Sequence, residues 1–187
     1  HSFPTRRSSD LDSFWYNAVE AEVYAMASLF IAVLFWLGLR WEQDMDQPKG
    51  NRWLLLICLV VGLSFGVHFM ALLTIPSIGF LYYFKHFKTV TVKNFIIANI
   101  VVMSVLLFIF KLLLPLTMGF FGQSEVFMVN NLGLPFNSGT IFVTVLLIGI
   151  FYFGLKYTRT HNYVQLNTLL LSILFIFIGF STWMMLP

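Results

Sequence analysis

The chain is a succession of apolar segments separated by short polar stretches. The apolar segments cover 14–39, 53–67, 70–84, 94–116, 139–155 and 163–183. A bilayer core of about 30 Å requires about 20 helical residues. The first, fourth and sixth segments satisfy this length, and the fifth nearly does. The pattern therefore predicts an all-α polytopic transmembrane helical bundle with about six spans.

The run from Trp53 to Phe84 needs separate treatment because it is too long for one span. As a single helix it would be about 48 Å long at about 1.5 Å per residue. It would also place the basic residues before and after it on opposite sides of the membrane, although Lys and Arg favour one side. We therefore predict a break near Val67–Phe69, with arms shorter than the bilayer core. Gly66 and Pro76 fit such a break.

With this break, the basic residues gather on one side of the membrane. The loops predicted to face inside hold Arg40, Lys49, Arg52, Lys85, Lys88, Lys93, Lys156 and Arg159. The residue 12 end and the residue 187 end are then expected outside. The basic pI of about 9.1 is explained by this topology, and no nucleic-acid partner is expected.

Composition supports the same class of protein. The chain is 59% hydrophobic and 10% charged, with a mean hydropathy of +0.85. A soluble domain of this length needs a more polar surface, so a membrane protein is expected, with the lipid bilayer as its first partner. The single cysteine, Cys58, excludes an intrachain disulfide.

Residues 1–11, HSFPTRRSSDL, match the translation of a common sequencing adapter throughout. We interpret them as an adapter-derived artefact and exclude them from fold reasoning. Residues 12–187 are then expected to be a partial transmembrane domain that has been cut at both ends. A twin-arginine signal or a basic arm at Arg6 and Arg7 is the alternative interpretation.

The first apolar segment carries two acids, Glu20 and Glu22. Asn17, Glu20 and Tyr24 lie at i, i+3 and i+7 and share a helix face. Glu22 is about 200° from Glu20, so on a regular helix the two acids cannot hold one metal ion. Either one acid acts, or the turn is irregular. The acids either lie at headgroup level and favour the helix N-terminus, or they line an outward-facing active cavity.

Two further polar sites follow. His68 lies at the predicted break, where it could bind phosphate, relay a proton or hydrogen-bond the turn. The segment 117–138 is expected to be an outer loop, in which Ser124 and Glu125 begin a short interfacial helix. Asn130 and Asn131 indicate turn chemistry in this loop, which could bind a sugar donor or be a plain connector. No metal site is predicted, because no cysteine–histidine cluster is present in the sequence.

Three stretches together resemble one family: SFWYNAVEAEVYAM, RWLLLICLVVGLSFGVHFMALLTIPSIGFLYYFK and SEVFMVNNLGLPFNSG. They resemble the bacterial membrane family catalogued as domain of unknown function 2723, which is similar to animal protein O-mannosyltransferases. One departure lies at Met70–Ala71, where the family pattern has Leu–Asn. The resemblance implies the GT-C architecture in a bacterial inner membrane, with both described ends of the chain in the periplasm.

The resemblance also implies a function. Such enzymes move a sugar, for example mannose, from a polyprenyl-phosphate carrier to a protein or glycan acceptor on the outer side of the membrane. The family's main catalytic base lies in a first outer loop, upstream of this chain. Glu22 and then Glu20 are the supporting acids that the resemblance assigns, with a divalent cation left open as cofactor. The candidate substrate-binding residues are Asn17, Tyr24, His68, Asn130 and Asn131; among them the resemblance implies a place near the donor phosphate for His68, and Tyr24 lies in the matching motif Glu22–Val23–Tyr24. A polytopic transporter and a non-catalytic membrane subunit are the alternatives.

Overall fold

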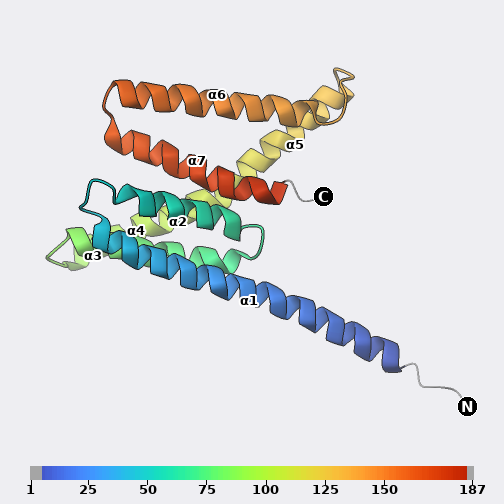
Figure 1. Cartoon of the computed structure of the whole chain (residues 1–187), viewed down its shortest axis with the longest axis horizontal. Coiled ribbons are helices and arrows are strands. Elements are labelled where there is room, and N and C mark those ends of the chain that lie inside the picture. The colour runs from blue at the N-terminus through green and yellow to red at the C-terminus, as the bar shows by residue number, and fades with distance from the viewer. Residues whose placement is uncertain (1–5, 185–187) are drawn as a thin grey trace, which may run out of the picture. The chain divides into compact units, whose positions relative to one another are not determined.

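The computed structural model describes the backbone of residues 6–184, and the side chains of Trp15 and residues 23–182. Every regular element in that range is helical (Figure 1). The elements are α1 (Arg6–Asp44), α2 (Asn51–Ser64), η1 (Phe69–Leu73), α3 (Thr74–His86), α4 (Val92–Leu107), η2 (Phe108–Leu113), α5 (Leu114–Asn130), α6 (Ser138–Thr160) and α7 (Val164–Met184). The chain divides into two compact units. Unit 1 comprises the residues up to Thr74 and from Phe175 onward, and unit 2 is Ile75–Leu174.

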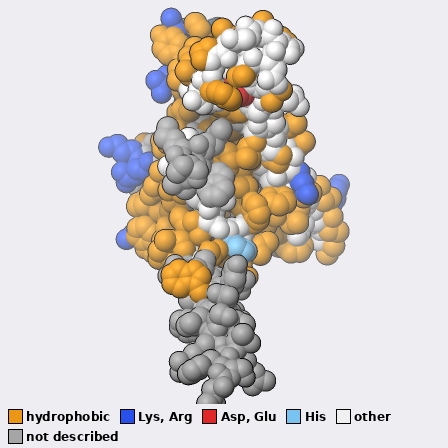
Figure 2. Space-filling model, turned by 90° about the vertical axis from the view of Figure 1, so that its right-hand side faces the viewer, with side chains coloured by type: hydrophobic (Ala, Val, Ile, Leu, Met, Phe, Trp, Pro, Cys, Tyr) orange, Lys and Arg blue, Asp and Glu red, His pale blue; other side chains and the backbone are white. Residues whose placement is uncertain are grey.

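Within the described residues, four helices are long and apolar enough to cross a membrane: Val23–Asp44, Val92–Asn130, Ser138–Thr160 and Val164–Thr182. Many of their large hydrophobic side chains are exposed, and such side chains cover much of the face in Figure 2. Exposed apolar surface of this extent is typical of contact with lipid or with other protein. Together these features confirm an all-α, multi-pass membrane protein. The sides on which its ends lie, and the origin of residues 1–11, stay predictions.

Unit 1 is built on the packing of α1 against α2. The two helices are joined by a turn that Asp44 organises. The Trp53 indole N–H donates to Asp44 Oδ2 at 2.7 Å, and Gln47 Nε2 donates to Asp44 Oδ1 at 3.2 Å. The Trp53 ring also meets Trp36 of α1 edge-on, with centroids 6.0 Å apart. The start of α2 is therefore fixed against the end of α1.

Two glycines bring α2 close to the C-terminal part of α7 within unit 1. A Cβ atom at Gly62 would overlap the carbonyl oxygen of Ile176, and one at Gly179 would overlap that of Leu59. The backbones therefore approach to a distance that no larger residue permits. Small residues at such crossings are typical of helix packing in membranes, where van der Waals contact replaces the hydrophobic effect.

The predicted break in the apolar run that follows Trp53 is confirmed, since α2 ends at Ser64 and η1 and α3 follow separately. Between them, His68 has an extended backbone with φ −163° and ψ 137°, and its N–H donates to the Ser64 carbonyl at 3.0 Å. The buried hydroxyls of Ser64 and Thr74 donate to the carbonyls of Val61 and Ala71, each at 2.7 Å. α2 and α3 have 14 and 13 residues, shorter than the bilayer core. The reversal of direction between them stays a prediction.

In unit 2, α4, η2 and α5 form one continuous helix from Val92 to Asn130. The middle segment, η2, is a π-helix, and Pro115 lies in the first turn of α5 directly after it. Proline has no N–H to donate to the preceding turn. A π segment shifts the hydrogen-bond register, so the helix continues through the proline instead of ending there.

This continuous helix corrects the expected outer loop over 117–138. Within that range only residues 131–137 are non-helical, and Ser124 and Glu125 lie inside α5 instead of beginning a helix. The residues from Thr117 to Asn130 are mostly apolar. Each glycine among them costs a helix only about 1 kcal/mol relative to alanine, which a run of this length tolerates. Of the two predicted turn residues, Asn130 is the last residue of α5 and Asn131 follows it in the turn. The left-handed positions of this turn are Gly133 and Asn137, with φ of 64° and 72°.

Candidate functional site

The structure brings two of the candidate substrate-binding residues into contact within unit 1. The rings of Tyr24, in α1, and His68, before η1, have centroids 5.4 Å apart and planes inclined by 47°. Tyr24 is 51% exposed and His68 is half-buried. An accessible aromatic and polar pair therefore lies where the broken helix meets α1.

The hydrogen bond of the His68 ring determines which ring nitrogen can donate to a ligand. His68 Nδ1 accepts the backbone N–H of Met70 at 3.1 Å and so caps η1. The proton of the neutral imidazole must then be on Nε2. Among the described residues, no hydrogen bond engages Nε2. An N–H donor beside the Tyr24 phenol suits an oxygen-rich anionic group such as a phosphate.

The other polar groups around the break bond within it. Ser64 and Thr74 are buried, and their hydroxyls are used by neighbouring carbonyls. Ala71 is fully buried, and its carbonyl accepts the Thr74 hydroxyl.

Asn17, Glu20 and Glu22 lie in α1, but their side chains lie outside the described residues. The backbone of α1 is α-helical from Arg6 to Asp44 without an irregular turn, so positions 20 and 22 are separated by about 200° around the helix. Position 20 is one turn before Tyr24. Among the side chains that the structure describes, no group of three or more His, Cys, Asp or Glu could hold a metal ion.

Asn130 and Asn131 belong to unit 2, whereas Tyr24 and His68 belong to unit 1. Both asparagines are exposed at the end of α5, where the Asn131 N–H donates to the Phe127 carbonyl at 3.0 Å. Asn131 lines an open hollow of about 480 Å³ with residues of α5. These asparagines are thus accessible to a ligand, and they belong to a different unit from Tyr24 and His68.

Glu125 has a role that sequence reasoning missed. Its Oε1 accepts the backbone N–H of Asn137, and its Oε2 accepts the Thr140 N–H at 2.9 Å and the Thr140 hydroxyl at 3.2 Å. Asn137 is the N-cap residue of α6, and its own side chain makes no cap. Glu125 therefore caps α6 from α5, with its charge at the positive end of that helix.

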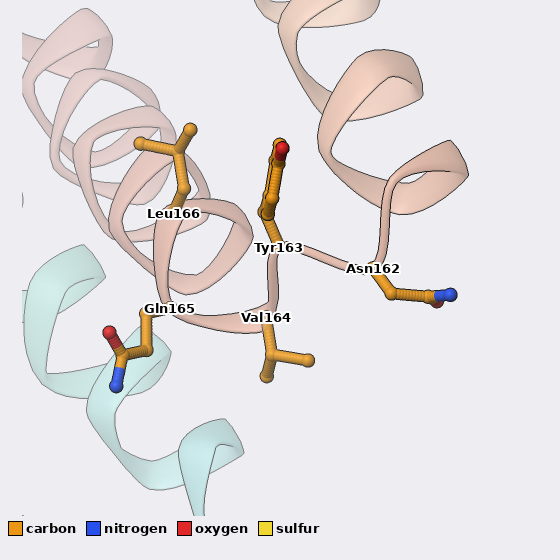
Figure 3. A pocket seen from close by; sticks show the side chains of 5 residues that line it. All are labelled: Asn162, Tyr163, Val164, Gln165 and Leu166. Atoms are coloured by element: carbon orange, nitrogen blue, oxygen red, sulfur yellow. The ribbon is translucent and has the colours of Figure 1, made fainter.

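A second open hollow, of about 580 Å³, lies at the turn between α6 and α7 and is lined by residues 162–166. Figure 3 shows that these side chains point in different directions instead of toward a common centre. Asn162 has a left-handed backbone with φ 56°, as a tight turn requires. None of the five is an acid, a base or a histidine, so the hollow is a feature of the turn.

Comparison with known proteins finds a family similarity in the N-terminal part of the chain. Residues 9–91 match the protein family described as the Protein O-mannosyl-transferase TMEM260 N-terminal domain. The match includes Glu20, Glu22, Tyr24 and His68, and it spans less than half of the chain. No curated protein and no solved structure matches. Over this part, the chain is similar to an O-mannosyltransferase family, and the similarity supports a glycosyltransferase-like membrane protein.

Proposed function

We propose that this chain is part of an integral membrane glycosyltransferase that moves a sugar from a polyprenyl-phosphate carrier to a protein or glycan acceptor. The observation that carries the proposal is the similarity of residues 9–91 to an O-mannosyltransferase family. The contact between Tyr24 and His68 supports it, because it places a phenol and an imidazole side by side within the matched region. The proposed orientation puts this site on the outer side of a bacterial inner membrane, with the basic loops inside.

Each candidate residue of unit 1 receives a role in this proposal. His68 donates Nε2–H to the phosphate of the donor, and Tyr24 packs against the sugar or the carrier beside it. Glu22, or Glu20 on the face that it shares with Asn17, orients the acceptor hydroxyl for the base that the resemblance places in an upstream loop. The substrate-binding role of Asn130 and Asn131, which belong to unit 2, stays a prediction of its own. Any divalent cation would rest on only one acid of α1, because positions 20 and 22 are about 200° apart on a regular helix.

The test is Glu22→Gln in the full-length protein that contains this chain. It removes the charge and keeps the shape, so sugar transfer should fall about 100-fold or more, as for loss of a group that assists proton transfer. Transfer to an acceptor is measured with a radiolabelled polyprenyl-phosphate sugar in proteoliposomes. Membrane insertion should be unchanged.

The matched control is Glu42→Gln, the same change on the same helix about 30 Å away along its axis. It should leave turnover as in the unaltered protein. Unchanged turnover in Glu22→Gln would remove Glu22 from the site. An equal loss in both variants would mean that α1 requires its charges for assembly and not for chemistry.

A further inference from the structure

A small cavity lies between α3 and α4 in unit 2, with a volume of about 210 Å³. The two helices cross closely at Gly79, where an added Cβ atom would lie 2.7 Å from a methyl carbon of Val102. From this crossing the cavity extends to the loop that joins the helices, since Phe87 and Asn94 also line it. The hollow therefore opens at the end of the helix pair, next to the loop.

Tyr83 lines this cavity and has an unsatisfied hydroxyl. The residue is only 5% exposed, and its ring stacks on Phe87 with centroids 5.0 Å apart. Its hydroxyl is buried and has no hydrogen-bond partner among the described residues. A buried hydroxyl without a partner is costly and unusual in folded proteins. Because Tyr83 lines the cavity, an oxygen-bearing ligand that displaces the atoms covering the hydroxyl would supply the missing acceptor.

The loop next to the cavity carries two lysines. Lys88 and Lys93 adjoin the lining residues Phe87 and Asn94 in the sequence, and both lysines are exposed. The sequence has no aspartate or glutamate between Asp46 and Glu125. The loop also immediately precedes the long apolar helix that starts at Val92, so it lies where a helix leaves the bilayer. Lysines at this level attract anionic lipid headgroups.

We propose that the cavity between α3 and α4 binds one anionic phospholipid. The lipid phosphate lies against Lys88 and Lys93, and an ester oxygen of the glycerol accepts the Tyr83 hydroxyl. The volume is far below that of a whole phospholipid, so only the glycerol region enters, while the acyl chains run along the exposed apolar surface of α4. The site is distinct from the proposed sugar-transfer site, and neither proposal depends on the other.

Native mass spectrometry of the purified chain, with phosphatidylglycerol and phosphatidylcholine supplied in equal amounts, tests the proposal. The unaltered chain should retain phosphatidylglycerol in preference. Each lysine near a headgroup changes lipid affinity about fivefold, so Lys88→Gln with Lys93→Gln should reduce the preference by roughly 25-fold. Tyr83→Phe removes only the hydroxyl and should lower phosphatidylglycerol retention about threefold to tenfold. Thermal unfolding checks that each variant is folded.

The matched controls are Lys156→Gln and Tyr157→Phe, the same changes at exposed positions near the end of α6. They should leave the preference intact. Because Lys88 and Lys93 are exposed, their replacement tests the proposal even if Tyr83→Phe unfolds. Equal retention of the two lipids by the unaltered chain would overturn the proposal. The proposal would also be overturned if the control variants lowered the preference for phosphatidylglycerol as much as the cavity variants do.

Discussion

The segments that follow α2 in unit 1 and α5 in unit 2 satisfy their backbone groups in different ways. At residues 65–73 in unit 1, the side chains of Ser64, His68 and Thr74 bond to backbone groups two or three residues away. At residues 131–137 in unit 2, the Glu125 carboxylate bonds to groups 12 and 15 residues ahead. The first segment is self-contained, whereas the second depends on two helices staying together.

This difference determines how each turn should respond to the loss of a side chain. A turn that is held by its own side chains can present His68 in one orientation whatever binds beside it. The turn before α6 has local bonds to the Met128 and Pro135 carbonyls, but α6 loses its N-terminal cap when the Glu125 carboxylate is removed. Variants at Glu125 and His68 should therefore have effects of different size and reach.

Glu125→Ala should give the largest effect. It removes three hydrogen bonds to a charged acceptor, and such bonds are stronger than neutral ones. Amide exchange at Asn137 and Thr140 should accelerate roughly tenfold or more, because the first turn of α6 loses its cap. Hydrogen–deuterium exchange of the chain in micelles measures this.

Gln123→Ala is the matched control, since it shortens an exposed polar side chain in the same helix two residues earlier. It should leave the exchange of α6 unchanged. The long-range cap would be refuted if Asn137 and Thr140 exchanged at the same rate in Glu125→Ala and in the unaltered chain.

The contrast also explains what could be predicted from the sequence. The break after Ser64 was predictable from the length of the apolar run and from nearby Gly66 and Pro76, which are local signals. A helix-capping carboxylate normally lies within the first turn of the helix that it caps. Glu125 lies well upstream of α6, so local capping rules assigned it to the start of a helix.

The candidate site was predictable only in part. The resemblance selected Tyr24 and His68, but their contact depends on how α1 packs against η1, which helical periodicity alone does not fix. The end of α5 was not predicted, since the apolar pattern ends the fourth segment at residue 116, whereas α5 extends to Asn130. The π segment before Pro115 depends on hydrogen-bond register and leaves no mark in the hydrophobic pattern.

His68→Ala should have an intermediate effect, confined to unit 1. It removes the side-chain cap of η1, which is worth about 1 kcal/mol of stability. His68→Asn keeps a cap acceptor and should recover most of that stability, but it removes the Nε2 donor. Thermal unfolding in micelles compares the two variants, with His161→Ala in unit 2 as the control.

The pair of His68 variants also separates structure from function. If His68 binds the donor phosphate, sugar transfer by the full-length protein should stay low in His68→Asn although stability returns. Transfer that recovers together with stability would limit His68 to capping the turn.

Pro115→Ala should have the smallest effect, because two changes of similar size oppose each other. Alanine makes the unfolded chain more flexible, which destabilises the fold by about 0.4–1 kcal/mol. It also adds an N–H that can donate to the preceding turn, worth about 0.5–1.5 kcal/mol. The net change in the free energy of unfolding should be close to zero, as it should for the control Pro48→Ala in the turn between α1 and α2.

A loss of unfolding free energy above about 2 kcal/mol would exceed both of these contributions and mean that Pro115 holds the π segment in place. Such a result would contradict the view that the π segment accommodates the proline, and it would make the long helix of unit 2 as dependent on one residue as the cap of α6 is on Glu125.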